Sequence, residues 1–201
     1  MMHGILAASL RVATGVRLQA GPLHDGDRAI FFANHTSHLD FALLWATLPA
    51  EVRAQTSPVA AEDYWDRPGL RRWIARRVFN AVLIPREGIT RANNPVERIG
   101  AVLEAGRSVI IFPEGTRSAD GQPGVFRSGL YHLARRFPGL PLVPVHLENL
   151  NRIMPKGTLL PVPLIARVSF RPPITFREDE EKNAFLTRAR AALLGEQAAL
   201  P

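Results

Sequence analysis

The sequence contains no cysteine, so disulfide bonds, thiolate metal sites and a cysteine nucleophile are all excluded. No apolar run approaches the roughly 20 residues that a helix needs to cross a bilayer. The first 13 residues are mildly apolar, but they lack the basic start and the small-residue cleavage site of a signal peptide. We therefore expect a cytoplasmic protein, peripheral on the cytoplasmic face of the membrane.

Lysine is almost absent as well, occurring only at Lys156 and Lys182, although the formal net charge is +7. Nearly all of the positive charge is arginine, whose planar guanidinium can bond two oxygens of a phosphate at once. The codon preference of a high-GC genome explains this bias equally well. A basic surface still indicates an anionic partner: nucleic acid, acidic lipid headgroups or a phosphorylated cofactor.

The 201 residues suit one domain, 1–201, because no linker or repeat divides them. Short apolar runs predict strands at 16–19, 29–33, 59–61, 81–84, 108–112, 142–147 and 165–171. Helical periodicity predicts helices at 1–13, 41–48, 70–78, 94–106, 128–137 and 176–194, with Asn94 and Ser128 as caps. This alternation predicts an α/β sandwich with a mostly parallel central sheet flanked by helices, in which sites gather at strand ends.

The first motif, NHTSHLD at residues 34–40, follows a predicted strand. A histidine accepts a hydroxyl proton best when a carboxylate holds its other ring nitrogen, so His35 and Asp40 suit a general base and its partner. Taken alone, this spacing also fits a loop histidine and a helix N-terminal charge. Ser37 lacks the Gly-x-Ser-x-Gly surroundings of a nucleophile, which favours a supporting role. His35, His38 and Asp40 are also candidate metal ligands, but the remaining histidines lack the spacing of a metal site.

The second motif, FPEGTRS at residues 112–118, follows another predicted strand. Gly115 allows the backbone to approach a ligand closely, and Arg117 offers a phosphate clamp beside the hydroxyls of Thr116 and Ser118.

Together the motifs resemble the glycerophospholipid acyltransferase superfamily, of the bacterial lysophosphatidate acyltransferase type. Two weaker family signatures match VLIPR at 82–86 and LVPV at 142–145, so the resemblance covers residues 34–145. It implies O-acyl transfer from acyl-CoA or acyl-carrier protein to a lysophospholipid, first of all 1-acylglycerol 3-phosphate, without a metal or other cofactor. Another lyso-lipid acceptor is the close alternative, and a metal-dependent hydrolase using His35, His38 and Asp40 is the distant one. A non-catalytic binder of nucleic acid or lipid, driven by charge alone, leaves the paired motifs unexplained.

The resemblance also implies roles for the matching residues. His35 is implied as the general base and Asp40 as its partner. Acceptor binding is implied for Arg86, Glu114, Gly115, Thr116 and Arg117, and a supporting role for Asn34, Ser37 and Pro144. Pro85 is an uncommon residue before Arg86 in this family, so the acceptor headgroup is less firmly predicted than the reaction.

Aromatic and basic residues share the stretch 64–79, which is typical of a helix at an anionic membrane surface. An ordinary surface helix with its aromatic residues in the core fits the same stretch. Relatives often begin with a longer membrane-embedded segment, whereas 34 residues precede His35 here. We therefore expect the stretch 64–79 and the N-terminal helix to meet the lipid.

Overall fold

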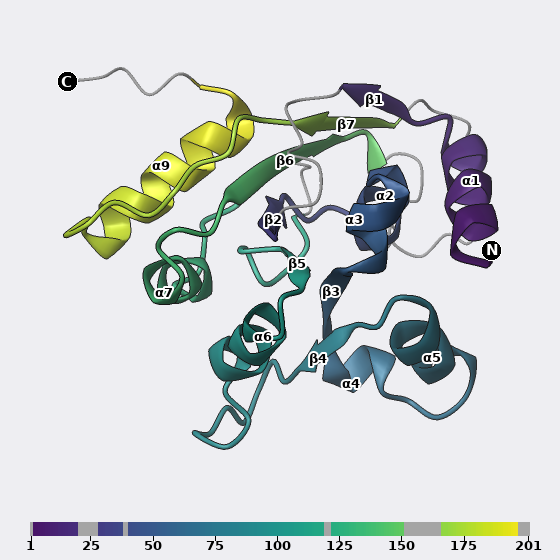
Figure 1. The fold of residues 1–201 in the computed structure, drawn as a ribbon, viewed down its shortest axis with the longest axis horizontal. Coiled ribbons are helices and arrows are strands. Elements are labelled where there is room, and N and C mark those ends of the chain that lie inside the picture. The colour runs from purple at the N-terminus through teal and green to yellow at the C-terminus, as the bar shows by residue number, and fades with distance from the viewer. Residues whose placement is uncertain (1, 20–27, 38–39, 119–121, 151–165, 197–201) are drawn as a thin grey trace.

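The computed structural model describes residues 2–19, 28–37, 40–118, 122–150 and 166–196 (Figure 1). Within these residues, seven strands form one sheet in the order β1-β7-β6-β2-β5-β3-β4. The strands are β1 Arg17–Gln19, β2 Ile30–Ala33, β3 Thr56–Ala61, β4 Val82–Ile84, β5 Ser108–Ile111, β6 Leu142–Glu148 and β7 Arg167–Phe170. Neighbouring strands run parallel except for β6 and β7, so the predicted α/β class and mostly parallel sheet are confirmed.

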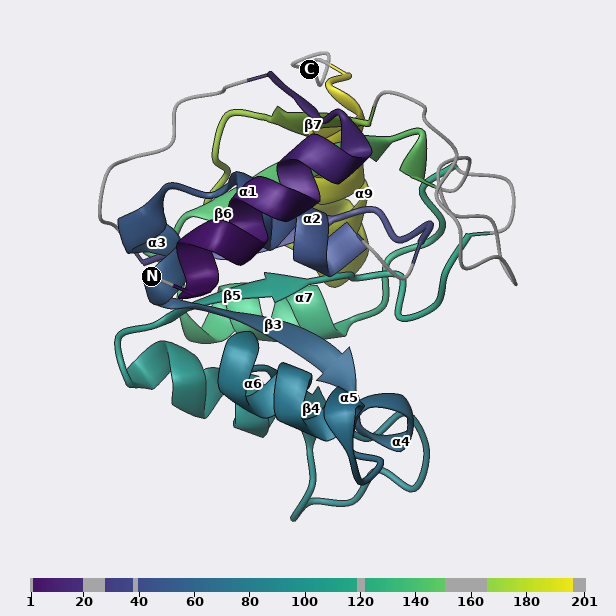
Figure 2. The same ribbon diagram turned by 90° about the vertical axis from the view of Figure 1, so that its right-hand side faces the viewer.

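Helices cover both faces of the sheet. They are α1 Met2–Thr14, α2 Asp40–Thr47, α3 Ala50–Ala54, α4 Glu62–Trp65, α5 Leu70–Trp73, η1 Ile74–Val78, α6 Pro95–Glu104, α7 Gly129–Arg136 and α9 Lys182–Leu194. Helices α1 and α2 lie on one side of the sheet, and α6, α7 and α9 lie on the other (Figures 1 and 2). Each side has its own hydrophobic core. Among the described helices, none has both the length and the apolar character needed to cross a bilayer.

The central strands position the two motifs. All residues of β2 and β5 are buried, as expected for strands covered on both faces. Strand β2 pairs with β5 through Ile30 and Val109, and with β6 through Ile30 and Leu142. Because these strands are parallel, their carboxyl ends share one edge of the sheet. The motifs that follow β2 and β5 are therefore neighbours.

Several predicted boundaries differ from the structure. Helix α9 begins at Lys182 rather than at 176, because Phe176 packs against Tyr131 and Phe185 from a non-helical segment. Strand β3 begins at Thr56, three residues earlier than predicted, and helices α3 and α4 were not predicted. The stretch 70–78 is helical, but its second half is a π-helical turn.

The two predicted helix caps have different outcomes. The Asn94 side chain accepts the Val96 N–H at 2.9 Å, which confirms the cap predicted there. The cap predicted at Ser128 is wrong in its chemistry, since the helix begins after Ser128 but the hydroxyl makes no capping hydrogen bond.

Candidate active site

His35 and Asp40 are in direct contact at the carboxyl end of β2. Asp40 is the first residue of α2 and is fully buried, where the helix N-terminus favours its negative charge. Its Oδ2 lies 2.8 Å from His35 Nδ1, and the His35 side chain remains 23% exposed. The structure therefore brings together the histidine and the carboxylate that the first motif pairs.

Backbone donors fix the Asp40 carboxylate. Its Oδ2 also accepts the Thr36 N–H at 2.5 Å and the Ser37 N–H at 2.8 Å. A carboxylate only accepts hydrogen bonds, so Nδ1 of His35 carries the hydrogen of this contact. In the neutral imidazole Nε2 then holds the lone pair, which is the state that a general base requires. Because the Thr36 and Ser37 N–H groups serve the carboxylate, they are not free to bind a thioester oxygen.

The second motif holds His35 from three sides. The Phe112 ring stacks on the imidazole, with ring centroids 4.4 Å apart and planes inclined by 25°. The His35 N–H donates to Glu114 Oε1 at 2.9 Å, and the Ser118 N–H donates to the His35 carbonyl oxygen at 2.8 Å. The stacking role of Phe112 escaped the sequence analysis, because nothing in the sequence indicates which ring lies on the histidine.

Glu114 is a buried carboxylate with both oxygens engaged. Its Oε2 accepts the Gly124 N–H at 3.0 Å, so the side chain ties the histidine backbone to the loop that precedes α7. Burial raises the pKa of this carboxyl, while the N–H groups of His35 and Gly124 act in the opposite direction. This geometry favours a positioning role for Glu114. The direct acceptor contact implied by the family resemblance stays a prediction.

Both the backbone conformation at position 115 and the nearby Arg127 side chain favour glycine there. Its φ is +72°, and a Cβ there would lie 2.8 Å from Nε of Arg127. Arg127 Nε donates to the Glu114 carbonyl oxygen at 3.1 Å, and the Arg127 N–H donates to the Pro113 carbonyl oxygen at 2.8 Å. Arg127 therefore braces the second motif, although it lies outside every motif and no sequence signal pointed to it.

An open pocket of about 580 Å³ borders the second motif. It is lined by Glu114, Thr116, Ser118, Gln122, Pro123, Gly124, Val125 and Arg190. Arg190 comes from α9 and donates from Nη2 to the Pro123 carbonyl oxygen at 2.9 Å. Arg117 is exposed beside this pocket and forms no ion pair with any residue that the structure describes. In the chain Arg117 lies between Thr116 and Ser118, which both line the pocket.

Arg86 lies farther along the same edge, after β4. Three spacings of about 4.8 Å separate β4 from β2, so the strand that precedes Arg86 lies about 14 Å from the strand that precedes His35. Its Nε and Nη2 donate to the two carboxylate oxygens of Asp63, at the start of α4. This hydrogen-bonded ion pair lowers the pKa of Asp63 and raises that of Arg86. The structure thus does not bring Arg86 against the motif residues, and it adds a competing carboxylate that sequence analysis missed.

Asn34 and Pro144 belong to the sheet that carries the site. The Asn34 amide accepts the Leu147 N–H and donates to the Leu147 carbonyl oxygen, both at 2.8 Å, and thereby extends the pairing of β2 with β6. Pro144 is buried in β6 opposite Phe32, in the core of the sheet. Ser37 is buried beside Asp40, consistent with a supporting role.

The metal alternative gains no further ligand from the described ranges. There, no three His, Asp or Glu residues come together in a group that could hold a metal ion. His38, the third candidate metal ligand beside His35 and Asp40, lies outside those ranges.

The sequence profile of the Acyltransferase family matches residues 16–148 of this chain. The chain therefore belongs to the Acyltransferase family.

Two relatives agree with that assignment. A 1-acyl-sn-glycerol-3-phosphate acyltransferase of Limnanthes alba is 32% identical over 156 residues, which are 77% of this chain and 53% of that protein. A protein of the same name from Haemophilus influenzae is 29% identical over 134 residues, covering 62% of this chain and 52% of that protein. This chain thus spans about half the length of these relatives.

The fold also matches a solved structure. The crystal structure of the 1-acyl-sn-glycerophosphate (LPA) acyltransferase PlsC from Thermotoga maritima aligns with a TM-score of 0.73 at 21% identity. The alignment covers 100% of this chain and 80% of that one. At this identity the match establishes the fold.

Proposed function

We propose that the protein transfers a fatty acyl group from acyl-CoA or acyl-carrier protein to a lysophospholipid hydroxyl. The observation that carries the proposal is the contact between His35 Nδ1 and the buried, backbone-anchored carboxylate of Asp40. Family membership supports acyl transfer, and the names of the relatives support 1-acylglycerol 3-phosphate as the acceptor and phosphatidate as the product.

The reaction needs one base and no covalent enzyme intermediate. The acceptor oxygen attacks the thioester carbonyl carbon while His35 Nε2 takes the hydroxyl proton. Asp40 stabilises the imidazolium that results. The carbon–sulfur bond then breaks, and the departing sulfur receives the proton from His35. Phe112 and Glu114 hold the imidazole in place during both steps.

Acceptor binding is assigned to the cations at the carboxyl edge of the sheet. Arg117 is an exposed residue of the second motif, and Arg86 would contribute if the phosphate displaced Asp63. Arg117 is the stronger candidate of the two, because it forms no ion pair within the described residues, whereas Arg86 is paired with Asp63. A lyso-lipid with another headgroup is the alternative acceptor, and it would depend less on Arg86.

A lipid acceptor places the reaction at a membrane, and we propose that the protein acts peripherally on an anionic cytoplasmic face. The exposed side chains of Ile5 and Val12 on α1 are compatible with the lipid contact predicted for the N-terminal helix.

An acyl-transfer assay with purified protein, a panel of lysolipids and both donor types tests this function. His35→Ala should reduce turnover by about 10²- to 10⁴-fold, the usual contribution of a general base. His132→Ala is the matched control, because His132 is exposed on α7 across the sheet. Full turnover in His35→Ala, with an unchanged melting temperature, would remove the proposed base.

A further inference from the structure

A short helical stretch beside the site exposes apolar side chains to solvent. Helix α5 and the π turn η1 run continuously from Leu70 to Val78 and bury Ala75 and Val78. On the opposite side Leu70 is 70% exposed and Trp73 is 50% exposed. Because these two residues are three positions apart on a helix, they lie on one face. Exposing a leucine and a tryptophan together costs free energy in water unless another surface covers them.

Arginines flank these apolar residues in the sequence. Arg67, Arg71, Arg72, Arg76 and Arg77 are all exposed, and residues 67–78 include no acidic side chain. The structure divides the five. Arg72 and Arg76 are paired with Asp66, whereas Arg67 and Arg77 have no ion pair within the described part of the chain.

Arg71 and the aromatic residues of the stretch 64–79 differ in whether they lie at the surface. The Arg71 guanidinium lies over the Tyr64 ring, 4.7 Å from its centroid, so its charge stays at the surface. Of the aromatic residues predicted to face a membrane, Phe79 is buried, and Trp65 packs against Phe41 in the core. The lipid-facing set is thus smaller than the sequence suggested. We name Arg67, Leu70, Arg71, Trp73 and Arg77 the α5 face.

The α5 face lies near the end of the sheet that carries the site. Helix α4 begins at Glu62, directly after the carboxyl end of β3, and α5 follows within the next eight residues. Figures 1 and 2 show α4 and α5 beside the end of β3. A surface that covered the α5 face would therefore meet the same edge of the sheet as His35 and Arg117.

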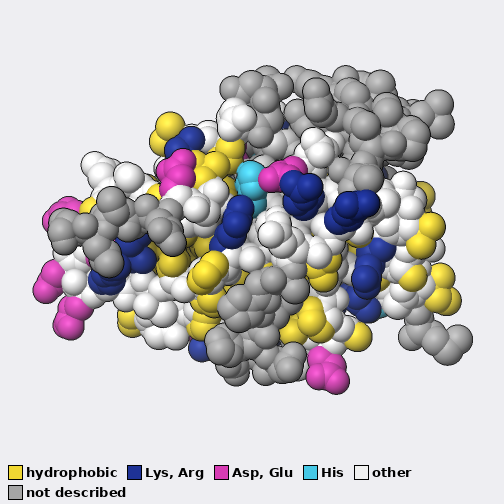
Figure 3. All heavy atoms as spheres, turned by 90° about the horizontal axis from the view of Figure 1, so that it is seen from above, with side chains coloured by type: hydrophobic (Ala, Val, Ile, Leu, Met, Phe, Trp, Pro, Cys, Tyr) yellow, Lys and Arg dark blue, Asp and Glu magenta, His cyan; other side chains and the backbone are white. Residues whose placement is uncertain are grey.

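The molecule has another basic face with a different character. Figure 3 views the top of the molecule, formed by β1 and β7, where basic side chains lie in a row. Arg17 and Arg167 are opposite one another there, and Arg167 is paired with Glu148. Two positions along the strands lie the exposed Gln19 and the buried Ser169, whose hydroxyl donates to the Gln19 side chain. The α5 face differs because it combines Leu70 and Trp73, each at least half exposed, whereas the exposed apolar residue of β1 is Leu18 at 41%.

We propose that the α5 face docks on an anionic lipid bilayer. Tryptophan is favoured at the boundary between headgroups and acyl chains, leucine gains by entering the apolar layer, and arginines bind lipid phosphates. Docking there brings the carboxyl edge of the sheet to the bilayer, so a lysolipid can reach His35 without fully leaving the membrane. This inference rests on the proposed function, which makes a membrane lipid the acceptor.

Vesicle flotation tests the docking directly. Wild-type protein should float with vesicles of phosphatidylglycerol and phosphatidylcholine, and much less with phosphatidylcholine alone. Removing charge with Arg71→Gln and Arg77→Gln should weaken binding by about fivefold for each arginine, because each one near an anionic surface contributes a similar attraction. The double variant Leu70→Ser, Trp73→Ser should weaken binding even at low ionic strength.

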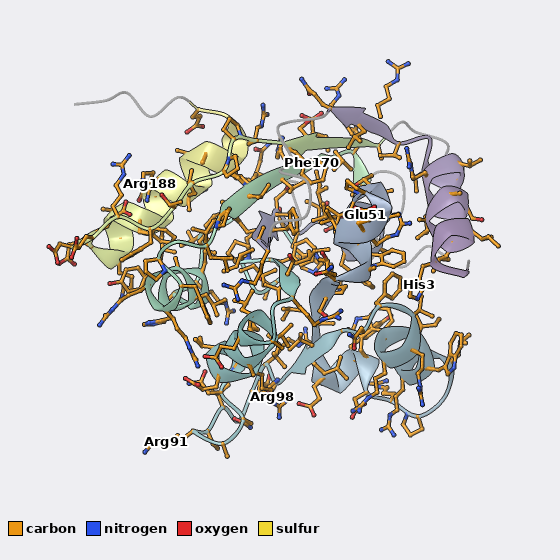
Figure 4. All side chains as sticks on the ribbon, viewed as in Figure 1. His3, Glu51, Arg91, Arg98, Phe170 and Arg188 are labelled. Atoms are coloured by element: carbon orange, nitrogen blue, oxygen red, sulfur yellow. The ribbon has the colours of Figure 1, made fainter. Side chains whose placement is uncertain are left out.

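The control removes the same chemical groups elsewhere. Ile89 and Arg91 are exposed in the loop between β4 and α6, and Figure 4 places Arg91 well away from α5. Ile89→Ser with Arg91→Gln should therefore float like the wild type. Equal flotation of the α5-face variants and the wild type, with unchanged melting temperatures, would overturn the proposal.

Activity measurements separate this proposal from the proposed function. With a short-chain lysolipid free in solution, the α5-face variants should keep wild-type turnover, whereas with vesicle-embedded acceptor their turnover should fall. Wild-type protein that floats but transfers no acyl group to either acceptor would refute the function and leave the docking intact. If the α5-face variants float like the wild type but have a raised KM for acyl-carrier protein, the docking proposal is overturned and the α5 face is assigned to binding of the carrier.

Discussion

Replacing Asp63 with asparagine should improve acceptor binding. The Asp63 carboxylate occupies two nitrogen donors of Arg86, which are the groups that a phosphate would use. Since Arg86 holds the pKa of Asp63 below its ordinary value, the carboxylate is charged at neutral pH and would compete with the phosphate of the proposed acceptor. The neutral amide of Asp63→Asn competes less.

The size of this effect follows from the exposure of the pair. The side chains of Arg86 and Asp63 are 52% and 55% exposed, and ion pairs with such exposure contribute about 0.2–1 kcal/mol. A tenfold change corresponds to about 1.4 kcal/mol, so KM for 1-acylglycerol 3-phosphate should fall by about 1.4- to 5-fold. The kcat should stay unchanged, because Asp63 and Arg86 follow β3 and β4, which are two and three strand positions from the β2 strand that precedes His35.

The assay compares KM and kcat for the phosphate acceptor in four proteins. These are the wild type, Asp63→Asn, Arg86→Gln and the double variant. Glu62→Gln is the matched control, since it removes a neighbouring exposed ion pair made with Arg98, which Figure 4 labels beside α6. The reasoning is refuted if Asp63→Asn leaves KM unchanged, or if KM falls equally in the Arg86→Gln background.

Two further substitutions test how the site is held, and a third tests the pH dependence of stability. Glu114→Ala leaves two partly buried N–H groups without their acceptor and should lower the free energy of unfolding by about 1–3 kcal/mol in urea titrations; unchanged stability would contradict the bracing role. Gly115→Ala should reduce kcat more than Gly106→Ala does, because both glycines have positive φ but only at Gly115 would a Cβ meet Arg127; equal effects would argue against that contact. Burial lowers the pKa of His146, so the folded state binds fewer protons there than the unfolded chain. Stability should thus fall as pH drops below about 6.5, and His146→Gln should reduce that fall in melting curves at pH 7 and pH 5; identical pH dependence would refute the assignment.

The sequence predicted the parts of the fold that follow from local patterns. The apolar runs of β2 and β5 fill the sheet centre because strands covered on both faces carry little else. Asn94 caps α6 because an amide oxygen one position before a helix has an unpaired N–H within reach. The contact of His35 with Asp40 was predictable for the same reason, since only five positions separate them.

Contacts between segments far apart in the chain could not be predicted from the sequence. Arg86 and Asp63 are 23 positions apart, and nothing in either segment distinguishes this pairing from the other exposed charges nearby. Arg127 reaches the Glu114 carbonyl oxygen and packs against Gly115 because of the course of the loop before α7. The course of a loop follows no periodic sequence pattern, so this contact could not be predicted. The start of α9 at Lys182 was missed because Phe176 fits helical spacing equally well, and its packing in the core decides the boundary.

The Asn34 amide has a consequence for which residues can precede the histidine. It presents a donor and an acceptor side by side, as a peptide group does, and Leu147 matches both. An aspartate of the same shape would place a second acceptor against the Leu147 carbonyl oxygen, and a serine would be too short to span both contacts. Position 34 therefore requires an amide side chain. The Leu147 backbone, 113 positions away in the chain, holds this side chain and so helps to fix the position of the adjacent His35.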